Sequence, residues 1–300
     1  NGISLVRRDV IVPTYPNSAV VNANLFEELD YNSDGDKTLL QNRRDMAYAL
    51  QTQTQEEMVK LIRKAVEMTG KKNVVISGGY GLNCVANYYY LEQLRDEDIN
   101  LYVEPVSNDA GTSIGAALIY YHHTTNSKNK SSSNLYLGPQ YHYTSEQILK
   151  LADEYNATIS DASQDDIVDL LEQRNIVTIF QGRCENGPRA LGNRSVLYDP
   201  SDPNGKDFVN SVKKREYFRP FAGSILLDDV HDWFDLRGMK DSPHMMYAVN
   251  CQPGVQEKIP AIIHVDGTCR IQTVTEEENP NYYNLIKAWK ERTGVPVIFN

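Results

Sequence analysis

Basic side chains gather between residues 182 and 221, in two short segments that also contain glycine and proline. The basic residues of interest in these segments are Arg183, Arg189, Arg194, Lys213, Arg215 and Arg219. Guanidinium groups and the backbone N–H groups at glycine are what proteins use to bind phosphate and carboxylate. Because the whole chain has a formal net charge of -10, this local basic cluster predicts a binding site for an anionic small molecule.

A third segment, residues 264–273, adds His264, Asp266 and Arg270 in one predicted turn. A single arginine would most simply form a surface salt bridge. Three separate clusters with the same chemistry instead favour a shared anion site. A lone histidine is usually a hydrogen-bonded structural residue, but these charged neighbours favour phosphate binding or proton transfer by His264.

Two glycine loops lie nearer the N-terminus, each after a predicted strand. The first contains Gly78, Gly79 and Asn83, just before a predicted helix. Glycine there lets a nucleotide approach the backbone, although an ordinary tight turn without a ligand would have the same pattern. In the second loop, Asp109 precedes another helix. Its carboxylate would either cap that helix or bind a metal ion, because hard cations prefer carboxylate oxygens.

Length and composition limit the class of protein. Three hundred residues predict two domains, and 41% hydrophobic residues are typical of a soluble globular protein. The sequence has no apolar run near the roughly 20 residues that a membrane span needs. The acidic balance argues against a nucleic-acid surface. The four cysteines are widely spaced, with no zinc or disulfide pattern, which predicts reduced thiols and a cytoplasmic location.

The order of elements predicts an α/β fold. Residues 123–134 are rich in serine, asparagine and lysine and predict a flexible linker. On both sides of it, predicted strands alternate with predicted helices. The expected strands lie near residues 74–76, 101–103, 176–180 and 295–299, and the expected helices near 58–70, 84–94, 113–121, 145–155, 164–172 and 282–293. Thr144 with Gln147, and Ser163 with Asp166, have the pattern of a capping box.

Three motifs together resemble a known family. They read Gly-Arg-x-Glu-x-Gly-Pro-Arg-Ala-Leu-Gly-x-Arg-Ser over 182–195, Lys-x-Arg-Glu-x-Phe-Arg-Pro-Phe over 213–221, and His-Val-Asp-Gly-Thr-x-Arg-x-Gln-Thr over 264–273. They are similar to the motifs of O-carbamoyltransferases of the nodulation-protein-U type, which include antibiotic-tailoring enzymes. The resemblance extends from the helix before Gly78 to Asn300, and the first sixty residues contribute little to it.

The resemblance implies two domains. Residues 1–122 would be the C-terminal part of an actin/sugar-kinase-like ATPase domain that transfers the carbamoyl group. Residues 135–300 would form a threonylcarbamoyl-adenylate-synthase-like α/β domain with an incomplete C-terminus. The resemblance thus predicts that the chain is a fragment of a longer protein.

The resemblance also implies a reaction and a set of site residues. In the family, carbamoyl phosphate and ATP with Mg give carbamoyl-adenylate and pyrophosphate, and the carbamoyl group then passes to a hydroxyl of a small metabolite. Transfer in the first domain uses a bound divalent metal, often described as iron. Carried over by motif, the expected catalytic residues are Lys213, Arg215 and His264. The expected nucleotide- and substrate-binding residues are Gly78, Gly79, Asn83, Arg183, Arg189, Arg194, Arg219 and Arg270, and the expected metal ligand is Asp109.

One departure leaves alternatives open. The family's histidine pair of metal ligands is missing, because the sequence has no His-x-x-x-His. The expected partners are carbamoyl phosphate, ATP and a hydroxylated acceptor, with no nucleic acid or membrane, and the oligomeric state is open. Two other functions remain: a tRNA threonylcarbamoyl-transfer-like protein, against which the acidic balance weighs, and a non-catalytic nucleotide-binding module.

Overall fold

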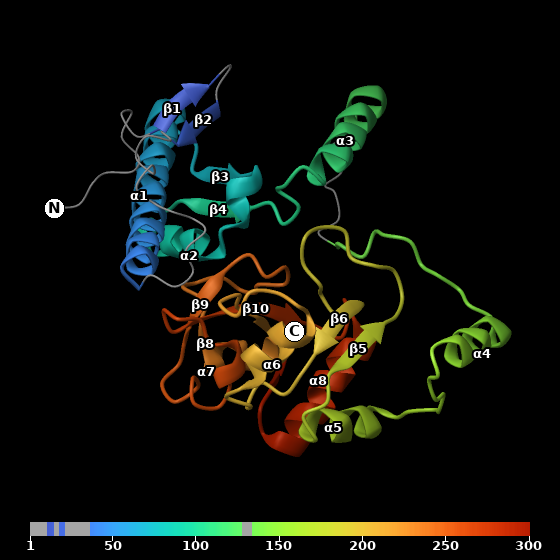
Figure 1. Ribbon diagram of the computed structural model, residues 1–300. Helices are drawn as coiled ribbons and strands as arrows, with labels where there is room; N and C mark the ends of the chain where they lie inside the picture. Colours follow the sequence, from blue (N-terminus) through green and yellow to red (C-terminus); the bar gives the residue numbers. More distant parts are fainter. Residues whose placement is uncertain (1–10, 15–17, 22–36, 128–133) are drawn as a thin grey trace. The chain divides into compact units, whose positions relative to one another are not determined.

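A computed structural model describes residues 11–14, 18–21, 37–127 and 134–300 (Figure 1). The chain divides into two compact units. The first contains residues up to 74 together with 89–102, and the second contains 75–88 and 103–300. The fold is mixed α/β, as the sequence predicts. The finer assignment to an actin/sugar-kinase-like and a threonylcarbamoyl-adenylate-synthase-like domain, with limits 1–122 and 135–300, stays a prediction.

The first half of the chain is built mainly from helices and two small sheets. Strands β1 (Ile11–Thr14) and β2 (Ser18–Val21) pair antiparallel, and β3 (Asn73–Ile76) pairs with β4 (Asn100–Val103). The helices are α1 (Lys37–Thr69), α2 (Cys84–Gln93) and α3 (Gly111–Thr125). Helix α1 is much longer than the predicted helix that starts near residue 58, and Gly70 follows it with a left-handed φ of +66°.

A five-stranded mixed sheet is the centre of the second unit. Its strands, in spatial order, are β11 (Val297–Phe299), β7 (Ala222–Leu226), β10 (Thr268–Val274), β9 (Ala248–Cys251) and β8 (Phe234–Asp235). The central pair β7–β10 is parallel and the other pairs are antiparallel. All five residues of β7 are buried, which explains why this strand has no polar-apolar alternation.

Two helices, α5 (Gln164–Glu172) and α8 (Pro280–Thr293), pack against this sheet on one apolar core. Further helices in the C-terminal part of the chain are α4 (Ser145–Glu154), α6 (Gly205–Val212) and α7 (Val230–Trp233). The core joins Val168 and Leu171 of α5 to Tyr282, Ile286 and other residues of α8. Helix α4 has no buried residue. The two predicted capping boxes, at Thr144 and Ser163, are present, and a left-handed Gly294 ends α8.

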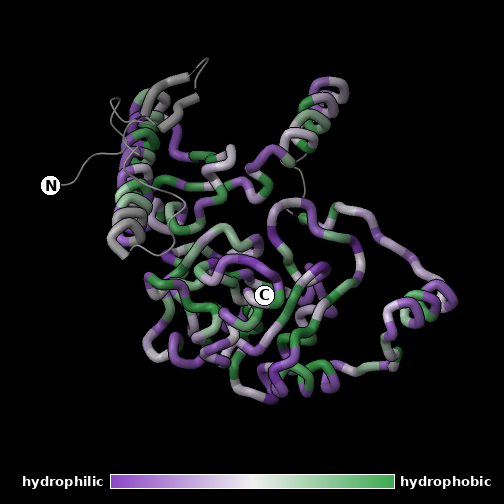
Figure 2. Tube along the Cα trace, viewed as in Figure 1, coloured by the Kyte–Doolittle hydropathy of each residue, from purple (hydrophilic) through white to green (hydrophobic). Residues whose placement is uncertain are grey.

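The predicted linker begins too early. Helix α3 continues to Thr125, so residues 123–125 are helical, and residues 128–133 lie outside the described part of the chain. The hydroxyls of Thr124 and Thr125 donate to helical carbonyls one turn back, and Asn126 ends the helix in a left-handed conformation. Figure 2 shows a hydrophobic stretch in the middle of α3, where Ile119 and Tyr120 are each 72% exposed. No helix in the described residues is long and apolar enough to span a membrane.

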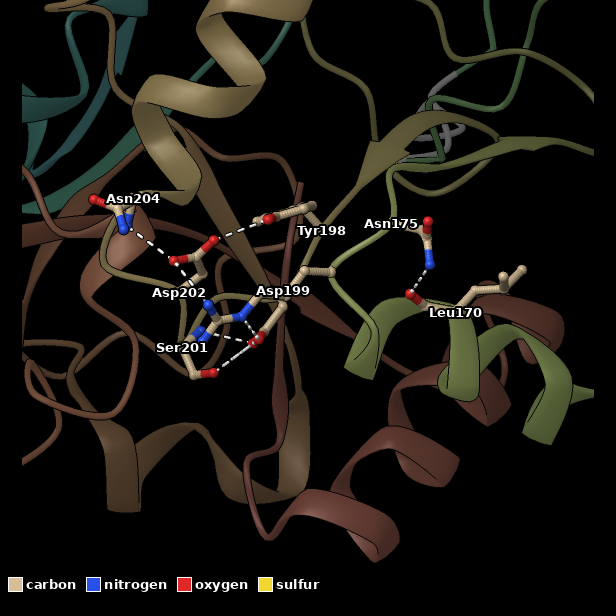
Figure 3. Close-up of polar contacts among 8 residues, drawn as sticks. Leu170, Asn175, Tyr198, Asp199, Ser201, Asp202 and Asn204 are labelled. Atoms are coloured by element: carbon tan, nitrogen blue, oxygen red, sulfur yellow. Dashed lines mark hydrogen bonds and ion pairs between the residues drawn. The ribbon is translucent and has the colours of Figure 1, made fainter.

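A turn rich in aspartate connects strand β6 (Arg194–Leu197) to helix α6 (Figure 3). Asp202 accepts a 2.9 Å hydrogen bond from the Tyr198 hydroxyl and another from the backbone N–H of Asn204. Asp199 accepts two from the backbone and hydroxyl of Ser201. Burial, and then the bond to Asp202, raises the pKa of Tyr198 to about 12. This turn fixes the start of α6, whose far end leads to the second basic segment.

Candidate functional site

The basic segments meet around one cavity of about 240 Å³ in the second unit. Its lining residues are Pro188, Arg189, Ala190, Arg194, Val196, Lys213, Arg215, Pro220, Phe221, Met245, Arg270 and Asn300. Five of these are arginine or lysine, and none of the described lining residues is a carboxylate. The structure therefore brings together five of the predicted site residues, drawn from all three motifs.

Among the cations that line the cavity, Arg270 has the most strongly shifted pKa. It lies on β10, opposite Ala222 of β7 and Ala248 of β9, whose small side chains leave room for it. Its Nε atom is buried without a hydrogen-bond partner. Burial, and then the nearby charge of Arg189, lowers the pKa of Arg270 to about 10. A bound anion would supply the missing acceptor and offset the repulsion between the two guanidinium groups.

Arg189 connects the cavity to the first glycine loop. Its Nη2 donates to the Leu82 carbonyl at 3.4 Å, while its Nε is also buried without a partner. Leu82 ends the short 3-10 helix η2 (Gly79–Leu82), which follows Gly78 in a left-handed conformation with φ of +97°. The Asn83 side chain then accepts the Ala86 N–H and caps α2. The contacts thus give Asn83 a structural role, and Gly78 and Gly79 do not line the cavity.

Lys213 and Arg215 reach the cavity from the turn after α6. Arg215 donates to the Asn210 side chain and to the Pro220 carbonyl, and its guanidinium lies 4.1 Å from the centre of the Phe221 ring. Burial lowers the pKa of both groups, and repulsion adds to it, from Arg215 on Lys213 and from Arg219 on Arg215. None of the described residues that line the cavity offers a carboxylate to neutralise these two groups.

The glycine-rich loop before β6 is organised by Glu185, whose role the sequence did not reveal. Its Oε1 accepts backbone N–H groups from Leu191 at 2.7 Å, Asn193 at 2.9 Å and Arg194 at 3.2 Å. Within the motif, Gly182, Gly187 and Gly192 all have left-handed φ values, which glycine adopts readily. This carboxylate therefore shapes the loop that presents Arg189 and Arg194.

Within the three basic motifs, three further predicted site residues do not line the cavity. Arg183 is exposed and donates to the Leu137 carbonyl at 2.9 Å, and Arg219 pairs with Glu216 at 2.6 Å. His264 lies beneath the turn: its Nε2 is 3.2 Å from the Phe221 carbonyl and its Nδ1 is 3.3 Å from the Thr268 hydroxyl. Burial lowers the pKa of His264, which favours the neutral ring.

Asp109 does not cap helix α3. The cap residue is Ala110, without a side-chain bond, and Thr112 donates to the backbone carbonyl of Asp109 rather than to its carboxylate. The exposed carboxylate of Asp109 thus has no capping role. Within the described ranges, no group of three or more His, Cys, Asp or Glu residues could hold a metal ion. The described residues therefore do not fit the transfer-site metal that the resemblance implies.

Other lining residues were missed or left without a role by the sequence. Phe221 lies inside a quoted motif, but only the fold shows that it stacks beneath Arg215. Asn300 reaches the cavity because β11 pairs with β7, and its side chain donates to the Ala190 carbonyl at 3.4 Å. No local pattern signals this residue, since its position depends on strand pairing between segments about seventy residues apart.

Comparison with known families gives two matches. The family model described as Carbamoyltransferase N-terminus matches residues 15–118, and the one described as Carbamoyltransferase C-terminus matches residues 168–300. The C-terminal match contains every residue that lines the cavity.

Similar proteins are found among proteins named as nodulation proteins. The chain is 34% identical over 267 residues to Nodulation protein NolO of Bradyrhizobium diazoefficiens, covering 87% of this chain and 48% of the relative. It is 33% identical over 235 residues to Nodulation protein U of Sinorhizobium fredii, covering 78% of this chain and 40% of the relative. The chain thus spans about half or less of the length of these relatives. Because the chain matches both the N-terminal and the C-terminal family models, and these relatives over most of its length, it belongs to the carbamoyltransferase family.

Proposed function

We propose that the cavity binds the phosphate groups of ATP and carbamoyl phosphate during formation of carbamoyl-adenylate, and that the carbamoyl group then passes to a hydroxyl of a small metabolite. The observation that carries the proposal is the lining itself: five cations and, among the described lining residues, no carboxylate. This lining complements a polyanion and would repel a cationic ligand. Membership of the carbamoyltransferase family supports the choice of the carbamoyl group.

The chemistry explains why several cations are needed. In adenylation a carbamate oxygen attacks the α-phosphorus of ATP, and the bond from that phosphorus to the bridging oxygen of pyrophosphate breaks. Carbamoyl phosphate must also lose its phosphate, by hydrolysis to carbamate, so phosphate and pyrophosphate both leave. Two anions therefore have to approach each other, and fixed positive charges offset their repulsion and stabilise the leaving group.

The described residues divide this work by their contacts. Arg189 and Arg270, each with a buried Nε that lacks a partner, would donate to phosphate oxygens inside the cavity. Lys213 and Arg215 would neutralise charge at its margin. His264 is better suited to hold neighbouring residues in place than to catalyse a step of the reaction, because both of its ring nitrogens face protein atoms. Its bond to the Phe221 carbonyl holds the ring on which Arg215 stacks.

Mg²⁺ fits this site only as an ion that arrives with ATP. The described cavity lining offers no carboxylate, so phosphate oxygens and water would supply its ligands. When bound, Mg²⁺ would neutralise part of the triphosphate charge. We place the transfer step in the part of the chain that matches the family's N-terminal model, and we derive no step through a metal at Asp109.

The proposal is tested by product analysis. Purified protein is incubated with ATP, Mg²⁺ and carbamoyl phosphate, and phosphate and pyrophosphate are measured separately. We expect pyrophosphate release that depends on carbamoyl phosphate and is accompanied by an equal amount of phosphate. Arg215→Met should lower the rate at least tenfold, whereas Lys287→Met, which removes an exposed charge on α8, should not. ATP binding without any pyrophosphate release would reject adenylation and favour a non-catalytic nucleotide-binding module.

A further inference from the structure

Three aromatic side chains stand exposed beside the cavity. Tyr141, Tyr143 and Phe180 are 54%, 50% and 58% exposed. The two tyrosine rings are stacked with centroids 6.2 Å apart, and they lie 6.1 Å and 6.3 Å from the Phe180 ring. We call these three residues the aromatic platform. So much exposed aromatic surface in one place marks an interaction site more often than a solvated surface.

The platform continues the wall of the cavity. Strand β5 (Val177–Phe180) pairs antiparallel with β6, with Phe180 opposite Arg194 and Thr178 opposite Val196. Directly opposite side chains in an antiparallel pair project from the same face. Arg194 and Val196 both line the cavity. The exposed face of this two-stranded sheet therefore carries a cavity-lining cation, Arg194, directly beside the aromatic ring of Phe180.

Arg194 joins the two surfaces rigidly. Its guanidinium lies 3.7 Å from the centre of the Phe180 ring. Its Nη1 donates to the carbonyls of Gln181 at 2.6 Å and Asn193 at 2.8 Å, and its Nη2 donates to Gly182 at 3.3 Å. These bonds use most of the donors that a phosphate would need. Arg194 is thus better placed to hold a flat stacked surface than to grip a phosphate.

The other side of the platform is also tied to the loop. Gln140, next to Tyr141, pairs with Arg183 in an isolated antiparallel bridge. The backbone N–H of Cys184 donates to the Pro139 carbonyl, and that of Gly138 donates to the Cys184 carbonyl. The chain that carries the tyrosines is therefore fixed to the same glycine-rich loop that presents Arg189.

We propose that the aromatic platform stacks against the nucleobase of the nucleoside triphosphate whose phosphates occupy the cavity. The inference rests on the proposed function, because it assigns the base of the same ligand. Exposed aromatic rings beside a cationic groove are the combination that binds bases and phosphates together, and stacking needs no polar contact to the base edge. The platform supplies the affinity for the base, and the cavity supplies the affinity for the phosphates.

The test separates the base from the phosphates. Titration calorimetry compares ATP with tripolyphosphate, which has the same three phosphates and no base. We expect the wild-type protein to bind ATP about tenfold or more tightly than tripolyphosphate. Tyr141→Ala and Tyr143→Ala should each lose about tenfold in affinity for ATP and keep the affinity for tripolyphosphate. Tyr143→Phe should behave as the wild type, and so should Tyr155→Ala, which removes an exposed ring after α4.

The outcomes distinguish this inference from the proposed function. Equal affinity of the wild type for ATP and tripolyphosphate would overturn the platform and leave the cavity as the phosphate site. Unchanged ATP affinity in both alanine variants would overturn it as well. Equal loss of both affinities would show that the rings support the fold instead of the base. Failure of the wild type to bind either anion would reject the cavity proposal, and the platform with it.

Discussion

Arg270 and Arg189 place two positive charges close together in the lining of the cavity, where neither Nε has a partner. Such an arrangement is unfavourable in the free protein, because burial and mutual repulsion both disfavour the charged form. It becomes favourable when an anion accepts from both side chains. At the scale of single residues, the candidate site is therefore defined by cations that have no carboxylate partner among the described lining residues.

Arg270→Met should separate anion binding from folding. The substitution removes the unfavourable charge and keeps much of the side-chain volume, so we expect the unfolding midpoint without anion to stay the same or rise. A saturating anion at about 100 times its Kd stabilises a protein by about 2.7 kcal/mol, and the variant should lose this gain. Thermal unfolding with and without tripolyphosphate measures both effects.

Lys287→Met is the matched control and should keep the full stabilisation by tripolyphosphate. A variant that unfolds earlier but still responds fully to the anion would show that Arg270 has a structural role only.

His264 should make the folded state sensitive to acid. Burial lowers its pKa below the ordinary histidine value of 6.5, so the unfolded state binds the proton first as pH falls. The free energy of unfolding should then decrease as pH falls from about 6.5 towards the folded-state pKa, by at most about 1.4 kcal/mol per pH unit. Urea unfolding of His264→Gln should lack this contribution. His231→Gln, at an exposed position of α7, should keep it. Identical pH profiles for the wild type and His264→Gln would contradict the burial argument.

At the scale of elements, the two capping boxes have the same local chemistry but different contexts. Helix α5 buries Val168 and Leu171 against α8, whereas α4 buries nothing. Ser163→Ala should therefore reduce the free energy of unfolding of the second unit by about 1 kcal/mol. Thr144→Ala should only fray α4, with no change in the main unfolding transition. Urea unfolding and amide hydrogen exchange distinguish the two, and equal effects on the main transition would show that α4 belongs to the core.

Gly192 couples the arginine loop to helix α8. It has a φ of +109°, and a Cβ there would lie 2.3 Å from the buried Tyr282 ring. Gly192→Ala should cost about 2–3 kcal/mol from overpacking and backbone strain together. Gly238 has a similar φ of +87° but open space around it, so Gly238→Ala should cost only about 1 kcal/mol. Chemical denaturation checks the pair. Similar losses would mean that backbone conformation alone, and not contact with Tyr282, requires glycine.

The sequence predicted best what depends on neighbouring residues. The two capping boxes follow from spacings of a few residues, and both are present. The predicted start of the linker was wrong, because polar residues do not by themselves end a helix. The stop signal was Asn126, a residue type that readily adopts the left-handed conformation found there.

The site was predicted in part for a related reason. Basic clusters in three motifs indicated a shared surface, and Arg189, Arg215 and Arg270 do line one cavity, while their role in binding stays a prediction. The direction of each side chain depends on strand pairing and loop shape, which the sequence does not specify. Arg219 therefore turned out to pair with its neighbour Glu216, and Arg194 to stack on Phe180. Asn300 entered the site only through the pairing of β11 with β7.

At the scale of the whole molecule, the family matches cover both halves of the chain, while the chain itself spans about half or less of its relatives. The complete cavity lies within the C-terminal match. Phosphate binding is therefore the property that the chain itself should show, independent of the acceptor and of the transfer step.

The most direct test of this property is a crystal structure of the protein with pyrophosphate. We expect pyrophosphate in the cavity, within hydrogen-bond distance of Arg189, Arg215 and Arg270, and no density there in crystals of Arg270→Met grown with the same ligand. Pyrophosphate bound elsewhere, with the five-cation cavity unchanged and without ligand in the wild type, would contradict the central claim that this cavity holds the phosphate groups of the reaction.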